Sequence, residues 1–273
     1  MNTFTDRVAR SIGRHFVSLS CVQHPPNGGE MRIHVFSGFV VDVAGEWFYV
    51  TAGHILRDIQ KAMNGSSIFD IWRLGDQTAG NRFNNAAIPY AFDPTHWFVL
   101  EDADVGLDYA TTHLGGLYRQ QLEAGGVTAI AKNAWSDHLT EHDHWALVGI
   151  PTETVSYDGK TVISARIVMA PLLPTDPPPL AEQRAQNQFY ARLADGSEQF
   201  VSDVVGMSGG PVIMLKKVEG AWKYSVIGVQ SGWYPSSRVV AVCPFSAFGH
   251  SLEPIVKEAL ALANQAEGSQ SAA

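Results

Sequence analysis

The chain of 273 residues is poor in cysteine and in basic residues, and both shortages exclude functions. Its two cysteines, Cys21 and Cys243, lie near opposite ends of the sequence and match neither a disulfide framework nor a zinc signature. Lysine and arginine number 19 against 27 aspartates and glutamates, which gives a net charge of −8. Because no basic cluster is present to neutralise a phosphate backbone, we expect no nucleic-acid partner.

Long apolar runs are also missing. No stretch of about 18 apolar residues occurs in the sequence, so we expect no membrane span and no membrane partner. The N-terminal stretch MNTFTDRVARSIGRHFVSLS has positive charges but no uninterrupted apolar segment after them, unlike a secretory signal. Together with the lack of a disulfide pattern, this predicts a cytoplasmic protein.

Short segments of alternating apolar and polar residues are what the sequence does contain. Hydrophobic residues make up 45%, charged residues 17%, and there are 25 glycines and 14 prolines, a globular composition rich in turns. Eleven segments are expected as strands: 16–22, 33–43, 46–52, 97–101, 108–114, 127–131, 144–150, 161–170, 209–215, 224–232 and 238–244. A proline-rich surface connection is expected at 172–187. So many short strands predict an all-β protein built from barrels or sandwiches.

The segment DVVGMSGGPVIM, residues 203–214, places Ser208 between glycines just before an apolar run. Glycine, serine and proline also make ordinary turns, so this segment alone does not identify a nucleophile. A catalytic serine needs a base to accept its proton and an acid to orient that base. The rest of the sequence has to supply both.

The predicted base is His54, which follows the apolar segment FYVTAG and opens a helical turn. The end of a rigid strand holds a catalytic group well, although the same position also suits a surface histidine. For the acid, the segment EDADVGLDYATTHL offers two aspartates. We prefer Asp108 because it begins the longer and cleaner strand, and Asp104 remains the alternative.

Four segments occur well separated along the chain: TAGH at 51–54, DYA at 108–110, GMSGGP at 206–211 and VIGVQSGW at 226–233. Together, and in this order, they resemble the signature segments of trypsin-like (chymotrypsin-fold) serine proteases, here of a bacterial intracellular type. The resemblance covers about residues 17–248, most of the chain. It implies a serine endopeptidase, a hydrolase that needs no cofactor, with His54, Asp108 and Ser208 as its catalytic triad.

The order of the three residues argues against another class of hydrolase. GMSGG also fits the G-x-S-x-G of α/β-hydrolases, in which an acid and then a histidine follow the serine. No aspartate follows Ser208, so Glu219 and His250 would have to serve. The serine is moreover followed by Gly-Gly-Pro and a β-like segment instead of a helix, so this alternative is weak.

The resemblance also implies an oxyanion hole. The backbone N–H groups of Gly206 and Ser208 should bind the developing oxyanion, and glycine permits the backbone angles that such a loop requires. One position departs from the family pattern: secreted animal members carry an aspartate before the serine, which pairs with a newly cut N-terminus. Here that residue is Met207, so activation by such an ion pair is not expected.

Substrate-binding residues follow from the same resemblance. The base of the specificity pocket would lie at Ser202, with Asp203 beside it. Ser202 alone suggests an uncharged pocket; an inward-facing Asp203 would select arginine or lysine, and a solvated loop carboxylate is the alternative. The substrate would add as a β-strand along Ser231, Gly232 and Trp233.

A histidine-rich segment, SDHLTEHDHW, places three histidines among acidic residues, and histidine and carboxylate side chains are metal ligands. Its histidines are His138, His142 and His144. Their separations fit no standard zinc signature, so we interpret the segment as a solvated polar loop and expect no metal.

The predicted architecture is two six-stranded antiparallel β-barrels, with the catalytic residues in the cleft between them. The expected division is an N-terminal helix at 1–14, barrels at 15–116 and 126–248, a C-terminal helix at 249–265 and a disordered tail at 266–273. A protein or peptide is the expected substrate, and activation by a protein partner stays open. The alternative function is a catalytically silent binding module that keeps the protease fold.

Overall fold

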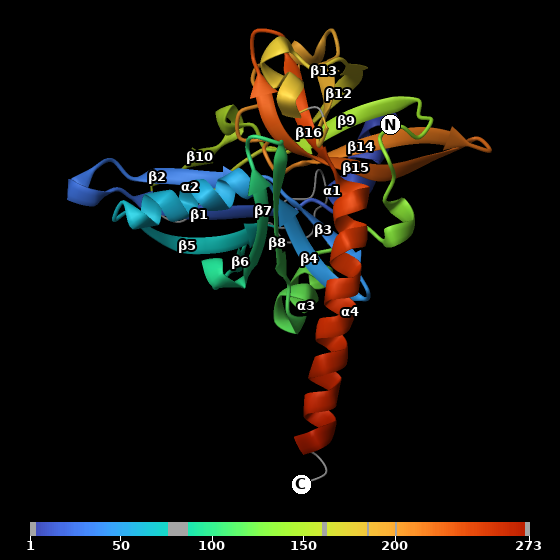
Figure 1. Cartoon of the computed structure of the whole chain (residues 1–273). Helices are drawn as coiled ribbons and strands as arrows, with labels where there is room; N and C mark the ends of the chain where they lie inside the picture. Colours follow the sequence, from blue (N-terminus) through green and yellow to red (C-terminus); the bar gives the residue numbers. More distant parts are fainter. Residues whose placement is uncertain (1–3, 76–86, 160–162, 185, 200, 271–273) are drawn as a thin grey trace.

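A closed six-stranded antiparallel barrel forms the C-terminal half of the chain (Figure 1). The computed structural model describes residues 4–75, 87–159, 163–184, 186–199 and 201–270. The barrel strands, in spatial order, are β12 (Val168–Thr175), β13 (Phe189–Leu193), β16 (Val239–Pro244), β15 (Ala221–Tyr234), β14 (Pro211–Val218) and β9 (His144–Gly149). Alternate residues of these strands, such as Leu147, Val212 and Val242, are buried in one cluster, as the two-residue period of a strand requires. This confirms the expected all-β class and the C-terminal barrel.

The N-terminal half differs from the prediction, because its described strands form two four-stranded sheets and not a closed six-stranded barrel. One sheet contains β2 (Arg32–Phe36), β1 (Ser18–His24), β5 (Ile68–Gly75) and β6 (Ile88–Pro89); the other contains β3 (Phe39–Val43), β4 (Glu46–Thr51), β8 (Leu107–His113) and β7 (Trp97–Asp102). The expected single strand at 33–43 is interrupted at Ser37–Gly38, where the chain passes between the sheets. A Cβ on Gly38 would lie 2.3 Å from the Tyr49 hydroxyl, so the tyrosine ring closes tightly over this break.

In the described ranges, four α-helices accompany the sheets: α1 (Phe4–Gly13), α2 (Gly53–Asn64), α3 (Gly116–Ala124) and α4 (Phe245–Gln270). Helix α4 is longer than the predicted 249–265 and includes part of the predicted disordered tail; residues 271–273, like 1–3, lie outside the described residues. It extends well beyond the sheets (Figure 1). No helix among the described residues is long and apolar enough to span a membrane. Short elements complete the chain: η1 (Pro26–Gly28), η2 (Pro94–His96), η3 (Lys132–Ala134), η4 (Thr152–Thr154), η5 (Pro179–Arg184), η6 (Ser197–Gln199), β10 (Ser156–Tyr157) and β11 (Ile163–Ser164).

One apolar cluster joins the two halves. It contains Phe39 from the N-terminal half, Ile213 and Val226 from the barrel, and Phe245 from the start of α4. The rings of Phe39 and Phe245 meet edge to face, with 5.5 Å between their centroids. Because residues of both halves form this core, the two halves are held in one relative position. Site residues that come from different halves are therefore also held in place relative to one another.

Candidate active site

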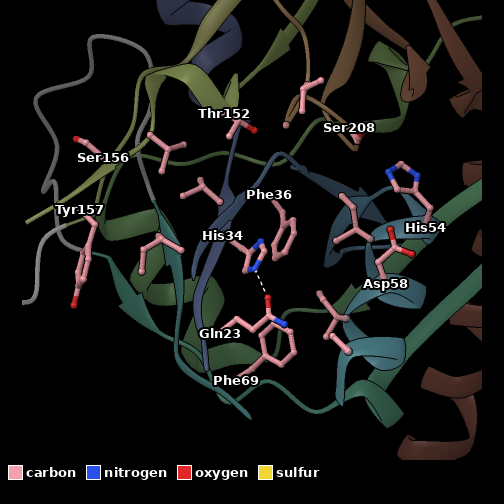
Figure 2. Close-up of a pocket in the computed structure, with 18 residues that line it drawn as sticks. Gln23, His34, Phe36, His54, Asp58, Phe69, Thr152, Ser156, Tyr157 and Ser208 are labelled. Carbon is pink, nitrogen blue, oxygen red and sulfur yellow. Dashed lines mark hydrogen bonds between the residues drawn. The ribbon is translucent and has the colours of Figure 1, made fainter. Parts of the chain in front are cut away.

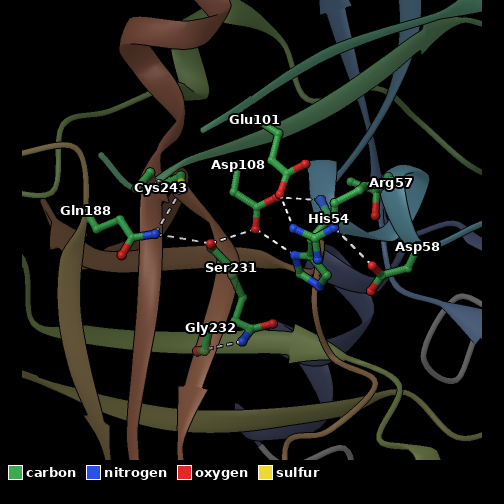
Figure 3. A network of polar contacts seen from close by, with 12 residues as sticks. His54, Arg57, Asp58, Glu101, Asp108, Gln188, Ser231, Gly232 and Cys243 are labelled. Atoms are coloured by element: carbon green, nitrogen blue, oxygen red, sulfur yellow. Dashed lines mark hydrogen bonds and ion pairs between the residues drawn. The ribbon is translucent and has the colours of Figure 1, made fainter. Parts of the chain in front are cut away.

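His54 and Asp108 are brought together by neighbouring strands, β4 and β8 (Figure 3). Helix α2 begins at Gly53, directly after β4, and places His54 in its first turn. The Asp108 carboxylate binds twice: Oδ2 lies 2.7 Å from His54 Nδ1, and Oδ1 accepts the His54 backbone N–H at 2.7 Å. The carboxylate therefore satisfies a free N–H group of the helix N-terminus and orients the ring at the same time. The other ring nitrogen, Nε2, has no partner among the described hydrogen bonds.

The electrostatics of this pair suit a catalytic base. Burial by itself lowers the pKa of His54, but the hydrogen bond and the charge of Asp108 outweigh it and raise the pKa above its ordinary value. Asp108 is 6% exposed. Burial alone would raise the pKa of its carboxyl, but the hydrogen bond and charge of His54 outweigh that effect and lower it. Asp108 thus stays ionised beside an imidazole that it stabilises in the protonated form.

A third hydrogen bond to Asp108 comes from the barrel. Ser231 Oγ on β15 donates to Asp108 Oδ2 at 2.7 Å, and Gln188 Nε2 lies 3.2 Å from that serine oxygen. Gln188 is held in turn by the Tyr190 hydroxyl, which donates to its Oε1 at 3.1 Å. The sequence predicts Ser231 as a substrate contact only, and it does not indicate Gln188, because no local pattern marks a glutamine just before a short strand. The Ser231–Asp108 hydrogen bond therefore ties the orientation of Asp108, in the N-terminal half, to the C-terminal barrel.

The alternative acid, Asp104, lies elsewhere. It is exposed in the turn between β7 and β8, where its backbone N–H is bound by Asp102 Oδ1 at 3.0 Å. The structure therefore brings Asp108, and not Asp104, to His54.

Ser208 lines the same cavity as His54 and Gly206, a space of about 610 Å³ (Figure 2). The serine is partly buried and sits in the loop that precedes β14. Among the described contacts, no hydrogen bond joins Ser208 Oγ to the imidazole. Catalytic hydrogen bonds in structures without substrate are often long and tighten only in the complex. The three predicted triad residues thus lie around one site, with the serine free to approach a substrate carbonyl.

The loop before Ser208 is held by hydrogen bonds to its carbonyl groups. The Val205 carbonyl accepts the Thr152 N–H at 2.8 Å, and the Gly206 carbonyl accepts the Ser37 hydroxyl at 3.1 Å. Because the N–H and C=O of a trans peptide point in opposite directions, the Gly206 N–H faces away from Thr152. Within the described part of the chain, neither Gly206 N–H nor Ser208 N–H is bonded to a backbone carbonyl. Both donors that the sequence predicts for the oxyanion hole are therefore available.

Backbone shape and packing also fix this loop. Gly206 has φ +91° and Gly209 has φ +84°, in the left-handed region that favours glycine. A Cβ on Gly209 would lie 2.0 Å from Thr51 Oγ1. Met207, at the position of the missing aspartate, is fully buried in the barrel cluster with Val204. Apolar packing and the Ser37 hydroxyl thus hold the loop where an ion pair is absent.

The two residues predicted at the pocket base, Ser202 and Asp203, are both exposed and do not line the cavity beside Ser208. The Glu153 carboxylate accepts the Ser202 N–H at 3.1 Å and also the Ser202 hydroxyl. Asp203 Oδ1 accepts the Val205 N–H at 3.0 Å, a local turn contact. Both side chains form hydrogen bonds with other residues at the protein surface. Their contact with substrate stays a prediction.

The other predicted substrate residues lie on β15, beyond Ser231. The Gly232 carbonyl accepts Gln230 Nε2 at 2.9 Å. Trp233 is partly buried and packs against the barrel cluster that contains Val204 and Met207.

The histidines of the polar loop lie against aromatic rings. His138 stacks on Phe189 with 4.3 Å between centroids, and His142 stacks on Trp145 at 4.7 Å. In the part of the chain that the structure describes, no group of three or more histidine, cysteine, aspartate or glutamate side chains could hold a metal ion.

Comparison with solved structures identifies the fold as that of trypsin-like serine proteases. The scabies mite inactivated protease paralogue S-I1 matches over 94% of this chain and 98% of its own, with 15% identity and a TM-score of 0.52. Paralogue S-D1 from the same mite matches over 91% and 94%, with 12% identity and a TM-score of 0.50. The protease Anisep from Arthrobacter nicotinovorans is 17% identical over 85% of this chain and 90% of its own, with a TM-score of 0.46. No protein-family model and no curated protein matches the chain.

Proposed function

We propose that the chain is a serine endopeptidase that acts through His54, Asp108 and Ser208. Ser208 Oγ attacks the carbonyl carbon of a peptide bond while His54 Nε2 takes its proton. The backbone N–H groups of Gly206 and Ser208 stabilise the oxyanion that forms. His54 then passes the proton to the leaving amine, and a water molecule releases the acyl group from Ser208 by the same two steps.

The observation that carries this proposal is the double hydrogen bond of Asp108 to His54 at the edge of the cavity that Ser208 and Gly206 line. A buried carboxylate that fixes one ring nitrogen selects the tautomer whose other nitrogen can accept a proton. Ser231 adds a third bond to the carboxylate, and neither predicted oxyanion donor is bonded to a backbone carbonyl of the described residues. A protein that used only the fold for binding would need none of these features.

A fluorophosphonate probe followed by mass spectrometry tests the proposal. The expected result is one adduct on Ser208, lost in Ser208→Ala and slowed by at least about 100-fold in His54→Ala. Thr95→Ala, an exposed residue of η2, is the control for substitution itself. Absence of an adduct on folded protein, with no peptide hydrolysis, would refute the proposal for the isolated chain.

A catalytically silent binding module is the second candidate. It is favoured by two observations: both mite structures are named inactivated proteases, and no described hydrogen bond joins Ser208 to His54. A protease that a protein partner activates would also leave the isolated chain unlabelled. Labelling that returns on addition of cell extract, and is lost in Ser208→Ala, would separate activation from a silent module. A cytoplasmic location stays a prediction.

A further inference from the structure

The cavity beside Ser208 is much larger than the catalytic residues themselves need. Its 610 Å³ lies in the range of ligand pockets. The hairpin of β1 and β2, helix α2, strand β5 and the segment 152–157 surround it (Figure 2). Most of its wall is apolar or aromatic, formed by Ile33, Val35, Phe36, Ile55, Ile59, Ala62, Phe69, Val155 and Val205. An apolar cavity that opens next to a nucleophile is suited to a substrate side chain.

The polar groups at the far side of the cavity bind one another. His34 Nε2 donates to Gln23 Oε1 at 2.8 Å, and Gln23 Nε2 donates to Ser67 Oγ at 2.9 Å. The His34 ring also stacks on Phe36, at 5.7 Å between centroids. Burial lowers the pKa of His34, so its ring is neutral at pH 7. This wall therefore adds no charge to the cavity.

The one carboxylate among the described lining residues is that of Asp58 on α2, whose side chain is 60% exposed. Its partner Arg57 lies 3.0 Å away, Nε to Oδ1, and also binds Glu101. One guanidinium thus serves two carboxylates, so the charge of Asp58 is only partly neutralised by Arg57. A substrate carboxylate at this rim would be repelled.

The topology of β15 shows which end of a substrate reaches the cavity. Strand β14 pairs with β15 only as far as Val229, and Gln230 is bonded to Gly209 and Gly210. Beyond that point, among the described residues, Gly232, Trp233 and Tyr234 pair on one edge only, with β16, and Ser231 lies in a bulge of that pairing. A peptide added antiparallel on the other edge would run from Tyr234 toward Ser231, so its C-terminal direction leads to Ser208. The residues before the cleaved bond would lie on β15, and those after it would pass into the cavity.

We propose that this cavity binds a large apolar side chain, such as phenylalanine or leucine, on the residue that follows the cleaved bond. The inference rests on the proposed endopeptidase function and deepens it: the substrate is selected on its leaving side. His54, which would protonate the leaving amine, lies in the cavity wall as this assignment requires. On the acyl side, by contrast, Ser202 and Asp203 are exposed and Trp233 packs against the barrel cluster.

Acyl transfer to added amines tests the cavity without knowledge of the acyl-side preference. The probe p-nitrophenyl acetate acetylates Ser208 and releases p-nitrophenol. An amino-acid amide then attacks the acetyl carbon; the ester bond to Oγ breaks, and the amine proton passes through His54 to Oγ. The measured quantity is the ratio of acetylated amide to acetate for phenylalanine, leucine, alanine, lysine and aspartate amides.

The expected result is that phenylalanine and leucine amides capture the acetyl group at least about tenfold better than alanine amide, with aspartate amide the poorest. Ala62→Phe, which fills the cavity from α2, should bring the phenylalanine-to-alanine ratio close to one. Ala124→Phe, the same change at an exposed position on α3, should leave the ratio unchanged.

The outcomes separate the two proposals. Acetylation of Ser208 followed by equal capture of all amides, or by preferred capture of lysine amide, would overturn the cavity assignment and leave the endopeptidase proposal intact. An unchanged ratio in Ala62→Phe would also overturn it. Failure to acetylate Ser208 would overturn the endopeptidase proposal and the inference that rests on it.

Discussion

Removal of the Ser37 hydroxyl should slow the chemistry at Ser208, although Ser37 touches neither the substrate nor the triad. Ser37 is fully buried. Its Oγ donates to the Gly206 carbonyl at 3.1 Å and accepts the Ile150 N–H at 2.9 Å. Ser37→Ala leaves the buried Ile150 N–H and the partly buried Gly206 carbonyl without this partner. The Gly206 peptide can then rotate, and rotation turns its neighbouring N–H donors away from the oxyanion.

Ser37→Ala should change two quantities, the labelling rate of Ser208 and the free energy of unfolding. Loss of an oxyanion donor costs about 2.7–4 kcal/mol, or about 100- to 1,000-fold in rate. Ser37 positions the loop but does not itself donate to the oxyanion, so Ser37→Ala should slow fluorophosphonate labelling of Ser208 by about 10- to 100-fold. Each unsatisfied buried group costs about 1–3 kcal/mol, so the free energy of unfolding should fall by about 2–4 kcal/mol.

Two measurements on the same variant separate positioning from general destabilisation: the labelling rate and the denaturant midpoint. Thr112→Val is the matched control, because Thr112 Oγ1 also donates to a carbonyl, that of His96, at 3.1 Å in a buried position away from the loop. It should lose stability and keep its labelling rate. A Ser37→Ala protein that is destabilised but labels within twofold of the unchanged chain would refute the reasoning.

Three further predictions concern His54, His15 and Gly209. Labelling of Ser208 should accelerate with rising pH and reach half its maximum above about pH 6.5, because the pKa of His54 is raised and its neutral form is the base; a midpoint below 6 would contradict this. Burial lowers the pKa of His15 to about 4, so acidification from pH 6.5 to 4 protonates the unfolded chain first and should cost about 3 kcal/mol of folding free energy at this residue. The decrease in denaturant midpoint between pH 6.5 and pH 4 should be smaller in His15→Gln than in the unchanged chain. Equal decreases in the two proteins would refute this role of His15. Gly209→Ala should lower the free energy of unfolding by about 2 kcal/mol or more and abolish labelling, because its Cβ would meet Thr51 Oγ1; normal labelling would show that the loop adapts.

Two of the three candidate catalytic residues, His54 and Asp108, are marked by their local surroundings, whereas Ser208 lies in a glycine-rich segment that also suits an ordinary turn. His54 follows a strand and opens a helix, and Asp108 begins a strand, so both positions are visible in a pattern of apolar residues. The choice between Asp108 and Asp104 needed the pairing of β4 with β8, which no local pattern contains. Ser37 and Gln188 act through contacts more than 40 residues away in the sequence, and nothing near them signals a role.

Several fold elements were missed for physical reasons. Strand β12 was expected to end at 170, but it continues through Thr175 into the predicted proline-rich connection and pairs there with β13, although Pro174 supplies no N–H. The predicted strand at 127–131 makes only an isolated bridge between Ile130 and Val41. Strand β5 carries Ile71 at φ +53°, an irregularity that breaks its alternation.

The core shared by the two halves also determines how the site should be lost when the protein unfolds. His54 and Asp108 come from one half and Ser208 and Ser231 from the other, while the cluster around Phe39 is made by both. If one half unfolded, the other would expose its apolar residues of this cluster to water. We therefore expect unfolding to be a single cooperative transition. Fragments cut between the halves would expose the cluster and should not reconstitute the site on mixing. The arrangement of His54, Asp108 and Ser208 is therefore expected only in the intact chain.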